Sequence, residues 1–171
     1  MQTLKEKLAQ YLPKLREEVR EIAKTNGDVV CGEVKIAQII GGMRGIRGLL
    51  CETSLVTPEK GLFIRGIHIS ELAQKLPEEI FYLMLLGELP NEEELTHLQG
   101  ELAKRATVPN YVWDLLENMP SDTHPMTLLV TGILALQNQS VFAKKYAEGM
   151  NKLDYWEPVL EDCVNLIGSL P

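Results

Sequence analysis

Residues that bind metals or form disulfides are scarce in this chain. It has three cysteines and three histidines, and no Cys-x-x-Cys pair. Cys31, Cys51 and Cys163 lie far apart, so their spacing indicates neither a zinc site nor a disulfide framework. We expect no bound metal, and we interpret the cysteines as reduced, buried thiols in a cytosolic type of compartment.

The motifs of common catalytic and nucleotide-binding sites are also missing. The sequence has no G-x-S-x-G, P-loop or G-x-G-x-x-G pattern. Carboxylates cluster at Glu78–Glu79 and Glu92–Glu94, but both clusters fall at predicted helix starts, where the helix dipole accounts for them. His68, His97 and His124 stand alone, and a structural role explains each better than catalysis: a surface position for His97 and a helix cap for His124.

Long apolar runs are absent as well, and the longest is too short to span a bilayer. The first six residues carry both acidic and basic side chains and resemble neither a signal peptide nor a transit peptide. The net charge of −7 gives no general attraction to nucleic acid. We expect a cytoplasmic protein with neither membrane nor nucleic acid as a partner.

What is present is mainly helical pattern, over a length of 171 residues that suits one domain. From Leu4 to Ile22 apolar residues recur every three or four positions, which predicts an amphipathic helix. Thr3 and Glu6 form a possible capping box at its start, and Asn26-Gly27 marks its end. Pro13 is expected to kink or split it.

Two segments differ from this pattern. Residues 49–56 and 62–69 are rich in aliphatic and β-branched side chains, and Thr57–Gly61 between them is typical of a hairpin loop. Everything afterwards is predicted to be helical. The expected fold class is therefore all-α, with one small antiparallel β-hairpin near residues 49–69.

Helix starts in the second half are indicated by capping residues. We predict caps at Ser70, Asn91 and Ser140, and a capping box formed by Asp154 with Glu157. Two helices, over residues 80–86 and 126–136, are apolar nearly all round. The first is expected to be buried, and the outer faces of such helices require a partner or form an exposed patch.

The most distinctive segment is the Gly/Arg corner, residues 41–48 with the sequence GGMRGIRG. Glycine allows positive φ and close backbone approach, and arginine presents a fork of donors suited to phosphate or carboxylate. Arg44, Arg47 and the nearby Arg65 could therefore bind an anion. Alternatively, the glycines serve only chain geometry and the arginines pair with Glu33 or Glu52.

Several segments together, in this order, resemble citrate synthase. They extend across essentially the whole chain, and the match looks closer to the eukaryotic, mitochondrial type than to the common bacterial one. Residues 74–81 are shorter than in the mitochondrial enzymes, which suggests a bacterial or divergent source. The segments are Gly41–Gly45, Leu49–Ser54, Arg65–Ile69, Leu83–Pro90, Ala103–Ala106, His124–Met126, Tyr146–Gly149 and Tyr155–Glu157.

The resemblance implies a multi-helical homodimer of acyltransferase activity, which condenses acetyl-CoA with oxaloacetate and water to give citrate and CoA. These are substrates, and no separate cofactor is expected. Residues 1–171 correspond to the N-terminal segment of the family's large domain, without the small domain. The compartment would be the mitochondrial matrix if the protein is eukaryotic and already processed.

The resemblance carries over no catalytic residue. The family's catalytic histidines lie in later motifs of the Pro-Leu-His-Gly and Gly-x-Gly-His types, and its aspartate comes later still; none of these occurs here. The groups that enolise acetyl-CoA are thus missing, and the chain alone is expected to be inactive.

Two positions match family residues that contact CoA phosphates, Arg44 and Lys152. At Lys152 some members have arginine, and lysine binds phosphate as a point charge without the bidentate fork. A solvated basic residue in a loop is the alternative interpretation of Lys152. Arg47 is expected to support the same cationic corner.

Two other functions remain open on the sequence. The chain could belong to a related enzyme, such as 2-methylcitrate synthase or citryl-CoA lyase, whose distinguishing residues would lie outside it. It could also be a non-catalytic helical subunit that completes a split enzyme.

Overall fold

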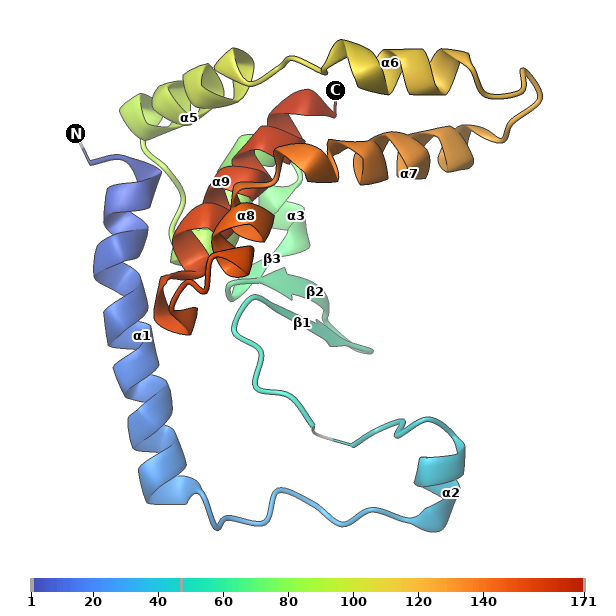
Figure 1. Cartoon of the computed structure of the whole chain (residues 1–171). Coiled ribbons are helices and arrows are strands. Elements are labelled where there is room, and N and C mark those ends of the chain that lie inside the picture. Colours follow the sequence, from blue (N-terminus) through green and yellow to red (C-terminus); the bar gives the residue numbers. More distant parts are fainter. Residues whose placement is uncertain (1, 47, 171) are drawn as a thin grey trace. The chain divides into compact units, whose positions relative to one another are not determined.

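The computed structural model describes residues 2–46 and 48–170, so that Arg47 lies outside the described residues. The chain divides into two units, Met1–Leu95 and Thr96–Pro171. Helix predominates, and the first unit also holds a small antiparallel sheet (Figure 1). The expectation of a largely helical fold is confirmed.

The chain opens with helix α1, Leu4–Asn26, whose start is capped as predicted. The amide of Thr3 donates to Glu6 Oε2 at 2.8 Å, and the amide of Glu6 donates to Thr3 Oγ1 at 3.3 Å. Of the two outcomes predicted for Pro13, a kink or a split, the split does not occur, because α1 continues through it as one element of 23 residues. Proline leaves one carbonyl of the preceding turn without its partner, and the other hydrogen bonds hold the helix together.

After α1 the chain runs through an exposed segment that contains the five-residue helix α2, Ile36–Ile40, and then reaches the sheet. The strands are β1 (Ser54–Thr57), β2 (Gly61–Ile64) and β3 (Ile67–His68), joined antiparallel in that order. Ser54 pairs with Ile64. The predicted hairpin is therefore present, but residues 49–53 are not part of a strand.

The sheet also has a third strand that the sequence did not predict. The second apolar segment is interrupted at Arg65 and Gly66, where φ is 48° and 82°. These left-handed conformations turn the chain back on itself, so that Phe63 pairs with His68. One predicted strand over 62–69 thus becomes two short ones.

Three helices follow the sheet: α3 (Ile69–Leu72), α4 (Pro77–Leu86) and α5 (Glu92–Lys104). Asn91 caps α5 as predicted, since its Oδ1 accepts from the amide of Glu94 at 3.0 Å. The cap of α3 is His68, whose Nδ1 accepts from the Ser70 amide at 3.2 Å, so the prediction of Ser70 as cap is wrong.

The second unit continues with two antiparallel helices and then a bent helical region (Figure 1). Helix α6 packs against α7, and α8 packs against α9. Gly132 of α7 is buried where Leu116 of α6 approaches: a Cβ there would lie 3.5 Å from Leu116 Cδ1. The elements are α6 (Asn110–Glu117), α7 (Pro125–Ala135), η1 (Leu136–Gln139), α8 (Val141–Ala147), η2 (Lys152–Asp154) and α9 (Trp156–Ser169).

Two of the predicted caps in this unit are confirmed and one is wrong. His124 Nδ1 accepts from the Met126 amide, and Ser140 Oγ accepts from the Ala143 amide. The predicted capping box of Asp154 with Glu157 does not form. Helix α9 begins at Trp156 directly after η2, and no side chain caps it, because the preceding backbone is already helical.

Both units contain buried residues, and α4 is buried as predicted through Tyr82, Leu83 and Leu86. In contrast, α6 and α7 expose large apolar side chains, among them Trp113 at 52% and Leu134 at 69%. The exposed apolar side chains of α7 agree with the prediction for residues 126–136, and those of α6 add to the same apolar patch.

The prediction of buried cysteines is wrong. Cys31, Cys51 and Cys163 are free thiols, as expected, but all three are exposed. Cys31 and Cys51 lie in the irregular segments before and after α2, where little packs over the chain, and Cys163 lies on an exposed position of α9.

In the described part of the chain, no individual helix has the length and apolar character needed to cross a bilayer. The residues of α7, η1 and α8 reach that length and composition only as a pair bent by 50°.

Candidate functional site

The Gly/Arg corner begins where α2 ends, and its described residues form a tight turn. Gly42, Met43 and Gly45 have φ of 76°, 62° and 76°, a left-handed backbone that glycine adopts without strain. Gln38 holds the turn together: its carbonyl accepts from the Met43 amide at 2.7 Å, and its side-chain amide donates to the Arg44 carbonyl at 3.3 Å. The expected backbone corner is confirmed.

Arg44 lies on the outside of this turn. The residue is exposed, and its guanidinium makes no hydrogen bond or ion pair with any described residue. Its carbonyl alone is engaged, which fixes the backbone and leaves the side chain available. Five N–H donors in a planar fork therefore face solvent, in the arrangement that suits a phosphate.

Arg65 is committed to the fold instead. Its Nε and Nη2 donate to the Met84 carbonyl at 3.0 and 2.8 Å, and Nη1 pairs with Glu52 Oε2 at 3.2 Å. The side chain is only 11% exposed. Arg65 thus caps the C-terminal end of α4, where carbonyls lack helical partners. For this arginine the alternative of pairing with Glu52 is confirmed.

Lys152 belongs to the second unit, at the start of η2. Asn151 caps this short helix through a 2.9 Å hydrogen bond from the Leu153 amide to its Oδ1. Just before it, Gly149 turns the chain with φ of 84°. Lys152 is exposed, and its ammonium has no partner among the described residues. Arg44 lies in the other unit.

A surface hollow of about 440 Å³ lies beside the sheet in the first unit, and its polar lining includes a thiol that sequence reasoning missed. Cys51 Sγ lies 3.3 Å from Thr53 Oγ1. Hydrogen bonds from Thr53, and from the backbone of Ser54 and Thr53, lower the pKa of Cys51 to about 7. The spacing Cys-x-Thr-Ser was the only sequence signal for this environment.

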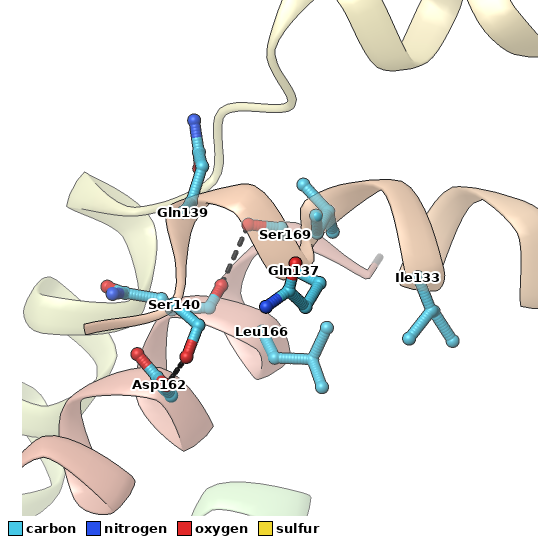
Figure 2. Close-up of a pocket in the computed structure, with 9 residues that line it drawn as sticks. Ile133, Gln137, Gln139, Ser140, Asp162, Leu166 and Ser169 are labelled. Atoms are coloured by element: carbon cyan, nitrogen blue, oxygen red, sulfur yellow. Dashed lines mark hydrogen bonds between the residues drawn. The ribbon is translucent and has the colours of Figure 1, made fainter. Parts of the chain in front are cut away.

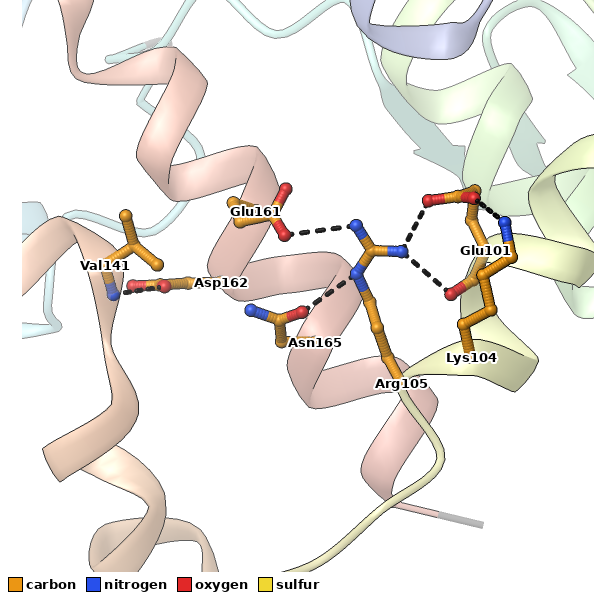
Figure 3. A network of polar contacts seen from close by, with 7 residues as sticks. All are labelled: Glu101, Lys104, Arg105, Val141, Glu161, Asp162 and Asn165. Atoms are coloured by element: carbon orange, nitrogen blue, oxygen red, sulfur yellow. Dashed lines mark hydrogen bonds and ion pairs between the residues drawn. The ribbon is translucent and has the colours of Figure 1, made fainter.

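In the second unit a charged network joins α5 to α9 (Figure 3). Arg105 donates to Glu101 Oε2 at 2.6 Å, to Glu161 Oε1 at 3.1 Å and to Asn165 Oδ1 at 2.9 Å. Hydrogen bonds from Lys104 and Arg105 lower the pKa of Glu101 to about 2. Because the guanidinium is fully engaged, this cluster is a structural connection between helices.

A second hollow, of about 150 Å³, lies between η1 and α9, with Asp162 at its edge (Figure 2). Asp162 accepts from Ser140 Oγ at 2.5 Å and from the amides of Val141 and Phe142 at 2.7 and 3.1 Å. These bonds satisfy the orphan amides at the start of α8. The carboxylate is therefore a helix cap contributed from a distant part of the sequence.

Two of the three histidines have structural hydrogen bonds. His68 is held by Ser70 Oγ at 2.6 Å and by the Lys60 carbonyl at 2.9 Å, and His124 caps α7. His97 is half-buried on α5. Within residues 2–46 and 48–170, no group of three or more histidine, cysteine or acidic side chains could hold a metal ion.

Comparison with known proteins identifies the family. Residues 42–171 match the family model described as citrate synthase, C-terminal domain. The chain is 40% identical to citrate synthase 4, mitochondrial, of Arabidopsis thaliana, 41% to the mitochondrial citrate synthase of Saccharomyces cerevisiae and 39% to that of Daucus carota. These alignments cover 98%, 99% and 98% of the chain. This relationship and the largely helical fold place the chain in the citrate synthase class of proteins.

The chain belongs to the citrate synthase family, as its motifs indicated. It spans only 38% of the length of each of these relatives. It therefore corresponds to part of a citrate synthase polypeptide. Arg44 and Lys152 both fall within the residues that match the family model. The assignment of residues 1–171 to the N-terminal segment of the large domain stays a prediction.

Proposed function

We propose that this chain is part of an enzyme that condenses acetyl-CoA with oxaloacetate and water to give citrate and CoA. The observation that carries the proposal is the identity of 39–41% with three citrate synthases over nearly the whole chain. The alignments extend over both units, which supports the proposal that the chain keeps the fold of these relatives.

Within that enzyme, Arg44 and Lys152 contact the phosphates of the CoA thioester. The exposed guanidinium of Arg44, on a turn fixed by Gln38, supports its role. Its fork can bind two phosphate oxygens, whereas the Lys152 ammonium acts as a point charge. In the family, the residue at the Lys152 position reaches CoA from the neighbouring subunit, so this assignment depends on a homodimer.

The chain by itself supplies no catalytic group. The structural roles of His68, whose two ring nitrogens both have hydrogen-bond partners, and of His124, which caps α7 through Nδ1, support this. General acid and base groups contribute factors of about 10²–10⁴ each to such reactions. Purified 171-residue chain should release no thiol above background from acetyl-CoA with oxaloacetate. Turnover by the chain alone would disprove this part of the proposal.

The condensing activity is tested by a chimera. Residues 1–171 replace the matched segment of the Saccharomyces cerevisiae relative, and thiol release is measured with acetyl-CoA and oxaloacetate. We expect citrate-forming turnover. A chimera that folds and dimerises like the parent enzyme but does not turn over would contradict the proposal.

The same chimera addresses acyl specificity only in part, because the residues that distinguish 2-methylcitrate synthase or citryl-CoA lyase would lie outside this chain. The native full-length protein, assayed with acetyl-CoA and propionyl-CoA, separates these activities. We expect acetyl-CoA to be preferred, since all three relatives compared are named citrate synthases.

We further propose that the apolar patch of α6 and α7 is covered in the assembled protein, by a second copy of the chain in a homodimer. Exposed side chains such as Trp113 and Leu134 support this, because isolated soluble proteins rarely leave large contiguous apolar patches open. The alternative of a non-catalytic subunit of a split enzyme rests on the same patch. If the chain is a subunit of a split enzyme, adding a separately encoded partner chain would restore turnover; if it is not, no such partner would do so.

The compartment and the expected lack of other partners complete the proposal. The relatives are named mitochondrial, which supports the mitochondrial matrix if the protein is eukaryotic; otherwise the cytoplasm is proposed. The net charge of −7 supports the expectation that nucleic acid is no partner. We also propose that the reaction proceeds without a cofactor besides its substrates. Imaging of the tagged native protein in its own cells would decide between the two compartments.

A further inference from the structure

Helix α1 is attached to the rest of the first unit by its first two turns. Leu4 and Leu8 are 9% and 5% exposed, and the helix packs against α4. Further along, its apolar side chains are open to solvent: Val19 is 44% and Ile22 49% exposed. The packing that holds α1 in place is therefore concentrated near Lys7.

Lys7 makes three contacts at this point. Its Nζ lies 2.6 Å from Glu94 Oε1 and 2.8 Å from Glu88 Oε1, and 5.5 Å from the centre of the Tyr82 ring. One side chain of α1 thereby connects to α4, to the start of α5 and to the loop between them. We call these four residues, Lys7, Tyr82, Glu88 and Glu94, the Lys7 cluster.

The two carboxylates of the cluster are not equivalent. The Glu94 side chain is 8% exposed, while that of Glu88 is 60% exposed. Glu94 Oε2 accepts from the Asn91 amide at 3.0 Å, so its other oxygen relies on Lys7. A buried carboxylate that loses its cation is strongly destabilising, whereas an exposed pair contributes little. Glu94 is therefore the partner that matters.

We propose that α1 is a detachable arm whose attachment is controlled by the ion pair between Lys7 and Glu94. When the pair is intact, Leu4 and Leu8 stay packed against α4. When it is lost, the first two turns leave α4 because docking would bury Glu94 without a cation. The sheet and α3 keep their contacts with one another, and Arg65 still donates to the Met84 carbonyl of α4, so the remainder of the unit stays folded.

The test is hydrogen exchange of the 171-residue chain, followed by mass spectrometry of peptides from each element. Lys7→Met keeps an apolar stem and removes the charge, and Lys14→Met makes the same change at an exposed position of α1. We expect residues 4–12 to exchange at least about tenfold faster in Lys7→Met, with α4 and α9 unchanged, and no change in Lys14→Met.

A double variant separates charge from packing. Adding Glu94→Gln to Lys7→Met removes the unpaired carboxylate, so protection of residues 4–12 should be partly restored relative to Lys7→Met alone. Equal exchange in Lys7→Met and Lys14→Met would overturn the proposal. So would faster exchange that extends to α9, since this reports global unfolding, or wild-type residues 4–12 that exchange as fast as residues 15–24.

Discussion

At the residue scale, two arginines from the same glycine-rich region have opposite roles. Arg65 is nearly buried and donates to the Met84 carbonyl and to Glu52, whereas Arg44 is exposed without a described partner. The sequence places both arginines in one cationic region and does not show which of them binds within the fold and which stays exposed. The partner carbonyl of Arg65 lies on α4, and its distance from Arg65 is a tertiary property.

Local hydrogen bonds were predictable for a related reason. The capping box of Thr3 with Glu6 and the cap by Asn91 join residues three positions apart, so their spacing is visible in the sequence. The same spacing at Asp154 and Glu157 forms no capping box, because the backbone before α9 is already helical. The cap that Asp162 gives to α8 comes from 22 positions away and has no sequence signature. The exposed cysteines were missed because exposure depends on what packs nearby.

Cys51 gives a prediction at this scale. Because its pKa is lowered to about 7, a large fraction is thiolate at neutral pH. Desolvation raises the pKa of Cys163. Iodoacetamide at neutral pH should therefore alkylate Cys51 before Cys163, as read by mass spectrometry of the digested chain. Thr53→Val removes the principal hydrogen bond to Cys51, so it should slow the alkylation of Cys51 and leave that of Cys163 unchanged. Equal alkylation rates of Cys51 and Cys163 in the wild type would contradict the lowered pKa of Cys51.

At the scale of elements, the sheet shows why a pattern can predict strands and still miss their number. The alternation of apolar residues over 62–69 predicted one strand, and the left-handed turn at Arg65-Gly66 divides it. A glycine marked the position, but the positive φ of Arg65 is imposed by its side-chain contacts with Met84 and Glu52. That constraint is tertiary.

The packing of α9 on α5 leads to a prediction with a matched control. A Cβ at Gly168 would lie 2.8 Å from the Leu102 carbonyl oxygen and 3.1 Å from Arg105 Cβ, whereas nothing lies within 4 Å at Gly100. Gly168→Ala should lower the free energy of unfolding by about 1–3 kcal/mol through overpacking. Gly100→Ala should raise it by up to about 1 kcal/mol through helix propensity. Urea denaturation measures both, and a stabilising Gly168→Ala would refute the close approach.

The network that joins these helices predicts a pH dependence. The folded-state pKa of Glu101 is lowered to about 2 by Lys104 and Arg105. Its contribution to stability is therefore complete above the ordinary glutamate pKa of about 4.3 and is lost as the pH falls towards 2. Between about pH 6 and pH 3, the urea midpoint should fall more in the wild type than in Glu101→Gln. In Glu59→Gln, a control substitution in an exposed loop, the urea midpoint should fall as much as in the wild type.

At the scale of the whole molecule, the fold class and the family followed from the sequence, because helical periodicity and ordered motifs extend over nearly the whole chain. The exposed apolar side chains of α7 were also foreseeable, because residues 126–136 are apolar nearly all round, whereas those of α6 were not predicted. The candidate functional site could be predicted from the sequence only in part. The Arg44 turn could be recognised, but whether its guanidinium is free depends on folding around Gln38.

The most direct test of the functional assignment is the KM for acetyl-CoA of the chimera that carries Arg44→Ala. One charge-assisted hydrogen bond contributes about 1.5–3 kcal/mol, so we expect KM for acetyl-CoA to rise about tenfold or more and KM for oxaloacetate to stay nearly constant. Arg20→Ala, which removes an exposed arginine of α1, is the matched control. A KM for acetyl-CoA that is the same in Arg44→Ala and Arg20→Ala would contradict the account.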